Sequence, residues 1–207
     1  MIKLNKYKSV IFDFDGVILD SNNIKKESIR EAAFGILSQQ KLNEFVTYFT
    51  DNNGIPREGK IAKFIVGNDF NEVLKKYNSL LAINLSHAKL VPGVENFIST
   101  LKDLRKKIFI LSGGTQREVV EILKSRGLYH YFDEVLGGPE DKSTNLMKFF
   151  LEKPALYFGD SKVDYKVSSS NGIDFVFVYG HTQINDWQNK TKSWDILTKI
   201  KNFEFGD

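Results

Sequence analysis

Two aspartates stand two residues apart at the end of an apolar run near the start of the chain. Asp13 and Asp15 follow residues 10–12, and a continuous apolar run of this kind predicts a strand buried on both faces of a parallel sheet. Strand periodicity directs both carboxylates to the same face. Two anions at this distance repel each other and lose hydration, so a cation or a dense set of hydrogen bonds has to hold them. Gly16 allows the chain to turn sharply directly after them.

Three further groups of polar residues fall at or beyond the C-terminal ends of later predicted strands. They are Ser112, Lys142, and the pair Asp160 and Asp164. Because parallel strands end along one edge of a sheet, where open α/β sheets bind ligands, these groups should converge there. An aspartate can attack phosphorus and form an aspartyl-phosphate, and a second carboxylate can serve as general acid and base. Carboxylates also suit Mg²⁺, and a hydroxyl, a lysine and the backbone N–H groups of Gly113 and Gly114 can bind phosphoryl oxygens.

Each of these residues also has a purely structural interpretation. Ser112 and Asp160 are both suited to cap a following helix. Lys142 is less easily explained, because the macrodipole disfavours a cation at a helix start, so an anionic partner is expected nearby. Asp164 would place a second negative charge on the helix face of Asp160, a penalty that a cation would remove. A structural explanation of the whole set requires four separate coincidences.

The hydrophobic pattern predicts the elements that position these residues. Strands are predicted at residues 10–12, 108–111, 134–136, 155–158 and 175–178. Helices are predicted around residues 94–101 and 119–123, then with Leu146, Met147, Phe149 and Phe150, up to Asn171, and finally with Ile196, Leu197 and Ile200. This alternation predicts an α/β protein with a doubly wound parallel sheet.

Residues 20–88, here called the helical insertion, carry four apolar stripes at helical spacing and no strand signal. They separate the first strand from the rest of the sheet. The predicted organisation is therefore a core of residues 1–19 and 89–207 with an all-helical domain inserted between them. A connection this long is expected to be functional, and it starts where the ligand site should be.

The composition excludes several other classes of protein. The 207 residues carry a net charge of only +3 with scattered lysines and arginines, which predicts no nucleic-acid surface. There are no cysteines, so disulfides, thiolate metal sites and a cysteine nucleophile are excluded. No apolar run suits a signal peptide or a membrane span, and a cytoplasmic protein without a membrane partner is expected. The oligomeric state cannot be predicted.

The four polar groups resemble, in order and position, the motifs of the haloacid dehalogenase superfamily of phosphohydrolases. The segment from Asp13 to Val17 matches the first motif, whose leading aspartate is the nucleophile and whose second, here Asp15, is the general acid and base. Ser112 matches the hydroxyl of the second motif, Lys142 the lysine of the third, and residues 159–164 the acidic fourth. The resemblance implies Mg²⁺ held at four positions, namely Asp13, Asp15, Asp160 and Asp164.

The helical insertion resembles the cap domain of the phosphoglycolate phosphatase and β-phosphoglucomutase branch. In that branch the cap closes over the phosphate and excludes water. Residues 54–57, which end in Arg57, are similar to a Gly-x-x-Arg segment of the mutases, whose arginine binds a second phosphate or another anionic group. Lys60, one turn further, would assist. A solvated arginine is an equally good interpretation of this short match.

A magnesium-dependent phosphatase acting on a small phosphorylated metabolite, with a sugar phosphate expected, is the leading functional hypothesis. Dehalogenation is disfavoured because the dehalogenases of this superfamily lack the acidic residue that is present here as Asp15. A sugar phosphomutase is the alternative that Arg57 favours, and a non-catalytic sensor of a phosphorylated ligand is a third. The chain departs from the family in the three serines at 168–170, and in lacking a Lys-Pro pair at Lys142.

Overall fold

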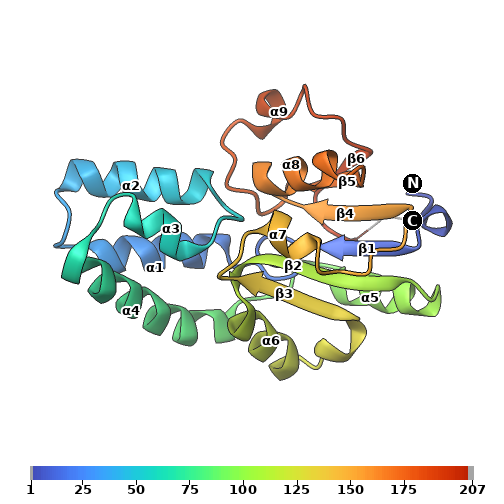
Figure 1. The fold of residues 1–207 in the computed structure, drawn as a ribbon, viewed down its shortest axis with the longest axis horizontal. Coiled ribbons are helices and arrows are strands. Elements are labelled where there is room, and N and C mark those ends of the chain that lie inside the picture. Colours follow the sequence, from blue (N-terminus) through green and yellow to red (C-terminus); the bar gives the residue numbers. More distant parts are fainter. Residues whose placement is uncertain (1, 205–207) are drawn as a thin grey trace.

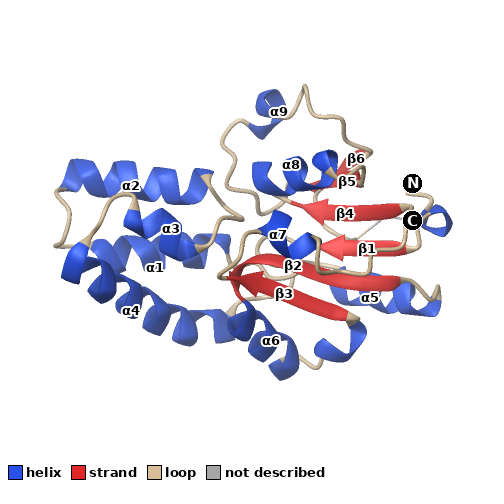
Figure 2. Ribbon diagram, in the orientation of Figure 1, coloured by secondary structure: helices blue, strands red, loops and turns tan. Residues whose placement is uncertain are grey.

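A computed structural model describes residues 2–204 of the chain. It contains a six-stranded sheet with helices on both faces and a group of four helices at one end of that sheet (Figures 1 and 2). None of the helices within residues 2–204 is long and apolar enough to cross a membrane.

All six strands are parallel and lie in the order β3-β2-β1-β4-β5-β6. Their bounds are β1 Ser9–Phe12, β2 Lys107–Thr115, β3 Glu134–Gly138, β4 Ala155–Gly159, β5 Asp174–Val178 and β6 Thr198–Ile200. Phe12 of β1 lies opposite Ile110 of β2 and Phe158 of β4. The strand order reverses between β1 and β4, which is where a doubly wound sheet forms its ligand crevice.

The two faces of the sheet belong to two separate apolar cores. Val10 and Phe12 of β1 pack with Phe97 of α5, whereas Ile11 packs with Val167 of α8 on the opposite face. The helices of this part are α5 Val94–Asp103, α6 Gln116–Ser125, α7 Lys142–Leu146, α8 Lys162–Ser170 and α9 Trp187–Lys190. Strand periodicity produces this division, since neighbouring residues of a strand point to opposite faces. The predicted doubly wound parallel α/β fold is confirmed.

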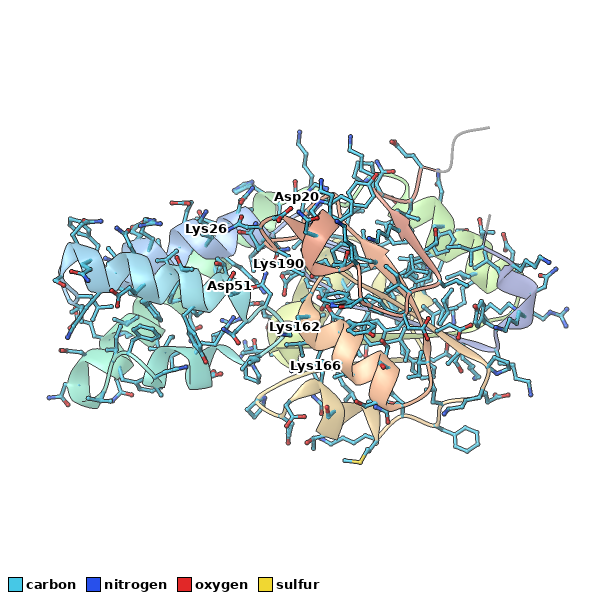
Figure 3. All side chains as sticks on the ribbon, turned by 90° about the horizontal axis from the view of Figure 1, so that it is seen from above. Asp20, Lys26, Asp51, Lys162, Lys166 and Lys190 are labelled. Atoms are coloured by element: carbon cyan, nitrogen blue, oxygen red, sulfur yellow. The ribbon has the colours of Figure 1, made fainter. Side chains whose placement is uncertain are left out.

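The exposed face of α8 shows why its polar residues do not disturb this packing. Lys162 and Lys166, four residues apart, lie on the outer side of the helix, exposed to solvent (Figure 3). Val167 and Ser168 face inward and are buried. The serines at 168–170 therefore place one buried hydroxyl in the helix, and Ser168 Oγ donates to the carbonyl of Tyr165 at 2.9 Å.

The helical insertion contains the four predicted helices. They are α1 Asn22–Ala33, α2 Gln39–Asp51, α3 Arg57–Ala62 and α4 Gly67–Asn84. Ser38 caps the start of α2, because its hydroxyl accepts from the N–H of Lys41, and Pro56 directly precedes α3. Figure 1 shows the insertion beyond the ends to which the arrows of β1–β4 point. It therefore lies over the carboxyl edge of the sheet, where the predicted site residues are.

Two predicted elements are wrong. The helix expected to continue to Phe150 ends at Leu146, and Met147 and Phe150 are exposed, because the chain has to turn back there to enter β4. The last predicted helix is instead the strand β6, preceded by Leu197, whose N–H donates to the carbonyl of Phe175. The open edge of β5 offered unpaired backbone groups, and satisfying them favoured a strand over a short isolated helix.

Candidate active site

Asp13 continues the line of β1 into the crevice between β1 and β4. Its N–H donates to the carbonyl of Phe158 at 2.9 Å, so the backbone of Asp13 is fixed by the sheet. The side chain is buried, and Oδ1 accepts from the N–H of Phe14 and from Nζ of Lys142, both at 2.7 Å. The second oxygen, Oδ2, takes no hydrogen bond from residues 2–204 and remains free to react.

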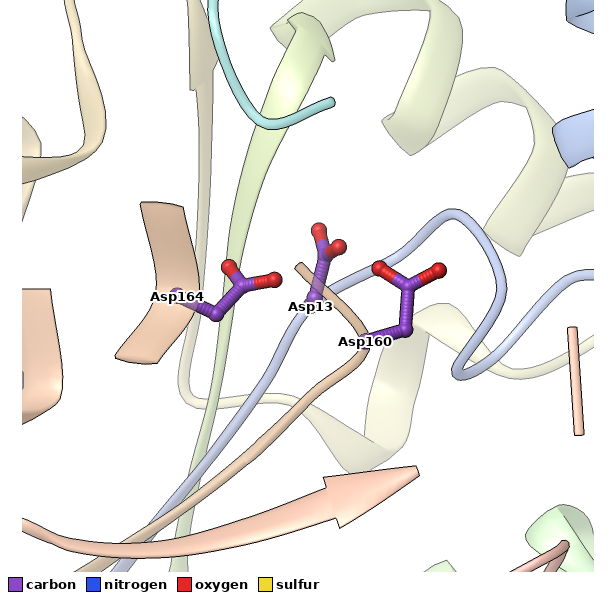
Figure 4. A group of neighbouring side chains, drawn as sticks. All are labelled: Asp13, Asp160 and Asp164. Atoms are coloured by element: carbon purple, nitrogen blue, oxygen red, sulfur yellow. The ribbon is translucent and has the colours of Figure 1, made fainter. Parts of the chain in front are cut away.

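Three buried carboxylates meet at this point. One oxygen each of Asp13, Asp160 and Asp164 lies within 4.8 Å of the others (Figure 4). Burial, reinforced by the charge of Asp164, raises the pKa of Asp13 to about 7, and burial together with Asp13 raises the pKa of Asp160 well above its usual range. Oδ2 of Asp160 accepts from Nδ2 of Asn22 at 2.7 Å, whereas its buried Oδ1 finds no partner among the described residues. Hard oxygen donors with an unsatisfied buried carboxylate atom fit a divalent cation.

Lys142 provides the positive charge within this cluster. It is the first residue of α7, directly after Asp141, whose side chain caps the helix by accepting from the N–H of Thr144. Its side chain is buried, and Nζ donates to Oδ1 of Asp13 at 2.7 Å and to Oδ1 of Asp164 at 2.6 Å. Burial alone would lower the pKa of Lys142, but the two carboxylates raise it above its ordinary value. Lys142 is therefore a permanent cation beside the nucleophile candidate.

Asp164 accepts four hydrogen bonds in the structure. Oδ1 accepts from Lys142 at 2.6 Å and from the hydroxyl of Tyr157 at 2.9 Å. Oδ2 accepts from the N–H of Ser161 at 3.1 Å and from its hydroxyl at 2.6 Å, which forms a capping box at the start of α8. These bonds fix the carboxylate of Asp164, which in turn holds the ammonium group of Lys142 in place.

Asp15 lies on the other side of Asp13 and is bound by the helical insertion. Its Oδ1 accepts from Ser21 Oγ at 2.6 Å, and its Oδ2 accepts from Nζ of Lys25 at 2.5 Å. Burial would raise the pKa of Asp15, but the charge and hydrogen bond of Lys25 outweigh it and hold the pKa below its ordinary value. In this arrangement Asp15 is an anion, the form that a general base requires.

The end of β2 supplies the hydroxyl and glycines predicted to bind phosphate. Ser112 is fully buried, and its Oγ accepts from the N–H of Gly114 at 2.9 Å, which leaves its own proton free to be donated. A Cβ at Gly113 would lie 2.6 Å from the backbone of Gly54. The glycine is therefore required for the helical insertion to approach the end of β2 this closely.

A small cavity separates the insertion from these carboxylates. Arg57, Lys60 and Lys25 line it from the insertion, with Asp13 and Asp15 on the opposite side. The space open to the centres of water molecules is about 30 Å³, which holds about two waters and no phosphate ester. The predicted site residues other than Ser112 thus lie in the acidic cluster or line this cavity, and Ser112 directly precedes Gly113 of the lining.

Sequence reasoning missed four residues of the site. They are Asn22, Lys25, Glu118 and Tyr157, of which Lys25 and Glu118 are indistinguishable in the sequence from ordinary charges on a helix surface. Tyr157 did carry a signal, because a tyrosine inside a fully apolar strand needs a partner for its hydroxyl. Hydrogen bonds to residues far along the chain define the roles of Asn22 and Glu118, so local patterns could not reveal them.

These features define the class of protein. Residues 10–178 match the family described as haloacid dehalogenase-like hydrolase, and the chain belongs to that family. The curated relatives that it matches are named phosphatases, so the chain is an enzyme of the phosphoric monoester hydrolase type.

The chain is also similar to particular relatives over most of its length. It is 24% identical to a phosphoglycolate phosphatase of Rhodobacter capsulatus over 185 residues, which are 81% of this chain and 82% of that one. It is 26% identical to a phosphorylated carbohydrates phosphatase of Thermotoga maritima over 193 residues, 86% of this chain and 88% of the relative. A crystal structure from Haemophilus somnus, described as a predicted phosphoglycolate phosphatase, shares the fold with a TM-score of 0.76 at 22% identity and covers 96% of this chain and 95% of that one.

Proposed function

We propose that the protein is a magnesium-dependent phosphatase that hydrolyses a small phosphorylated metabolite through an aspartyl-phosphate on Asp13. The observation that carries this proposal is the buried cluster of Asp13, Asp160 and Asp164 around Lys142, with Oδ1 of Asp160 unsatisfied. Such a cluster is costly to build unless a cation and a phosphoryl group complete it.

Magnesium is the cation that these donors suit best, because it prefers carboxylate and carbonyl oxygens together with phosphate and water. The carboxylates of Asp13 and Asp160 and the backbone carbonyl of Asp15 would hold it, with help from Asp164. When bound, Mg²⁺ neutralises phosphoryl charge and orients the group for attack.

In the first half of the proposed reaction, Oδ2 of Asp13 attacks phosphorus while the bond to the leaving oxygen breaks. Ser112 and the N–H groups of the adjoining glycines donate to the phosphoryl oxygens, and Lys142 offsets their charge. Asp15 transfers a proton to the departing alcohol. A dianionic phosphate close to Asp15 raises its proton affinity, which opposes the effect of Lys25 seen in the free protein.

In the second half of the reaction, Asp15 acts as a general base. Having lost its proton to the alcohol, it accepts one from a water molecule, whose oxygen attacks the phosphorus of the aspartyl-phosphate. The bond between phosphorus and Asp13 breaks, inorganic phosphate leaves, and both carboxylates return to their starting state.

The helical insertion serves as a cap in this proposal, with residues 20–88 as the cap domain on a core of residues 1–19 and 89–207. The cavity under it is too small for a phosphate ester, so a substrate enters only when the insertion moves away. The ion pair between Arg57 and Glu118 of the core, at 2.8 Å, supports the closed position. Closure would exclude water while Asp13 attacks.

The names of the relatives leave two classes of substrate open, a phosphorylated acid and a phosphorylated carbohydrate. A sugar phosphate was the expectation from the sequence. The mutase alternative needs Arg57 to bind a second phosphate, but in the structure its guanidinium is bound to Glu118 and Asn78. A non-catalytic sensor would not require both Asp13 and Asp15, which further supports a phosphatase.

Incubation with a panel of phosphorylated acids and sugars, with and without Mg²⁺, tests the proposal. We expect Mg²⁺-dependent release of inorganic phosphate from at least one of them. Isomerisation of a hexose 1-phosphate without phosphate release, in the presence of a trace of bisphosphate, would show a mutase instead. Binding without turnover of any compound would favour the sensor.

Magnesium is also expected to stabilise the protein. At a concentration about 100-fold above Kd the gain is about 2.7 kcal/mol, which corresponds to about 5–10 °C in Tm for a chain of this size. The shift should be smaller at pH 5 than at pH 8, because protons compete with the metal for Asp13, whose pKa is about 7. Thermal unfolding with Mg²⁺ or a chelator measures this.

Asp160→Asn should abolish the magnesium shift, whereas Asp103→Asn, at an exposed position at the end of α5, should keep it. An equal shift in wild type and Asp160→Asn would exclude Asp160 as a ligand.

A further inference from the structure

Three cations of the helical insertion face the cavity above Asp13 and Asp15. They are Lys25 of α1 and Arg57 and Lys60 of α3. Since substrate atoms beyond the phosphate would occupy the insertion side of this cavity, these cations are the charged groups there that can select the leaving group.

Two of the three are already neutralised by carboxylates of the core. Lys25 binds Oδ2 of Asp15 at 2.5 Å and lies 3.6 Å from Oε1 of Glu118. Arg57 donates from one nitrogen to both oxygens of Glu118, at 2.8 and 2.9 Å, and from another to Asn78. An added anion would have to displace Glu118 to reach Arg57, so this arginine is held by the core.

Lys60 is the exception. Its side chain is as deeply buried as that of Arg57, at 5% exposure, yet no carboxylate in residues 2–204 forms an ion pair with it. Within the described part of the chain, Nζ contacts the carbonyl of Phe49 at 3.3 Å and the face of the Phe49 ring, 3.7 Å from its centroid. A buried cation without a counterion is costly, and it recovers most free energy when an anion reaches it.

The electrostatic environment agrees with this geometry. Burial, followed by the neighbouring charges of Lys25 and Arg57, lowers the pKa of Lys60 to about 7, because Asp15 and Glu58 raise it by less. The free protein therefore holds Lys60 near the midpoint of its titration at neutral pH. An anionic ligand would complete its protonation.

We infer that Lys60, rather than Arg57, binds the leaving group, and that this group carries a carboxylate close to the phosphate. The inference rests on the proposed phosphatase function and names its substrate class as short phosphorylated carboxylic acids. One unpaired cation matches one negative charge, and a second phosphate would need the arginine that Glu118 occupies. The hydroxyl groups of a sugar would leave the charge of Lys60 unpaired.

The test compares two esters that differ only in the second functional group. 2-Phosphoglycolate and 2-hydroxyethyl phosphate share a phosphate and a two-carbon leaving group, but only the first carries a carboxylate. A hydrogen bond to a charged group contributes about 1.5–3 kcal/mol, so kcat/KM of the wild type should favour the acid by about 10- to 100-fold. Lys60→Met should reduce this ratio to below about threefold, and Lys60→Arg should retain part of the preference.

Lys63→Met provides the matched control, because Lys63 follows the same helix but is exposed. It should keep the wild-type ratio. Equal kcat/KM values for the two esters in wild type, or an undiminished preference in Lys60→Met, would overturn the inference.

Calorimetric binding separates this inference from the proposed function, because it needs no turnover. Both esters are titrated with Mg²⁺ into Asp13→Asn and into Asp13→Asn with Lys60→Met. At pH 8 the acid, compared with the neutral ester, should bind with additional proton uptake that disappears without Lys60. A Lys60-dependent preference without phosphate release from any ester would refute the phosphatase and keep the subsite. Phosphate release without a Lys60-dependent preference would support the phosphatase and refute the carboxylate subsite.

The lowered pKa of Lys60 also predicts how the free energy of unfolding depends on pH. Its pKa falls from an ordinary value of 10.5 in the unfolded chain to about 7 in the folded one. Between these values the unfolded chain binds more protons, so the contribution of Lys60 makes the free energy of unfolding rise with pH from about 7 to about 10.5. Lys60→Met should therefore be more stable than wild type at pH 7, with a difference that shrinks as the pH rises. Urea unfolding at several pH values measures it, and a difference independent of pH would contradict it.

Discussion

Replacing Asp13 by asparagine should reduce phosphate release by at least about 10⁴-fold, because an amide of the same shape cannot attack phosphorus. The fold should be retained, since the backbone of Asp13 is held by the sheet and Lys142 keeps its bond to Asp164 at 2.6 Å. Phosphate release under saturating Mg²⁺, together with circular dichroism of the variant, measures both effects. Mass spectrometry after rapid acid quenching should find phosphate on the peptide of Asp13 in the wild type alone.

Asp103→Asn, at the exposed end of α5, serves as the control for this experiment and should leave turnover unchanged. If Asp13→Asn retained magnesium-dependent turnover comparable to wild type, another group would have to be the nucleophile.

Removing Lys142 should have the largest effect on stability. In Lys142→Met, Asp13 and Asp164 lose the cation that binds them at 2.7 and 2.6 Å within the core. Breaking a buried ion pair on one side costs about 3–5 kcal/mol, and the loss should show in urea unfolding without metal. Turnover should also fall, because the phosphoryl charge loses Lys142. Mg²⁺ should restore part of the stability, since it brings positive charge to the same carboxylates.

Two further variants make this prediction specific. Lys148→Met, in an exposed pair with Glu140 at 3.6 Å, should change stability by no more than about 0.5 kcal/mol. Lys142→Met combined with Asp164→Asn should be more stable than Lys142→Met alone, because one unpaired buried anion is removed. A single Lys142→Met variant as stable as wild type in the absence of metal would contradict the ionic role.

The sequence by itself determined the class of fold and predicted which acidic residues meet at the candidate site. The apolar run before Asp13 and the strand before Asp160 are local patterns, and a strand buried on both faces leaves such a pattern whatever surrounds it. Because parallel strands end at the same edge of the sheet, chain order alone was enough to predict that Asp13, Ser112 and Asp160 converge. The four helices of the insertion likewise followed from local periodicity.

Only the tertiary structure decided which charges pair with which. Lys25, Arg57 and Lys60 look alike in the sequence, yet the first two have carboxylate partners, and Lys60 has none among residues 2–204. The strand β6 formed because an unpaired sheet edge lay beside residues with an ambiguous pattern. The physical reason is the same in both cases. Hydrophobic periodicity is a property of neighbouring residues, whereas ion pairs and sheet edges join residues far apart in the chain, and burial determines how much each of these contacts contributes.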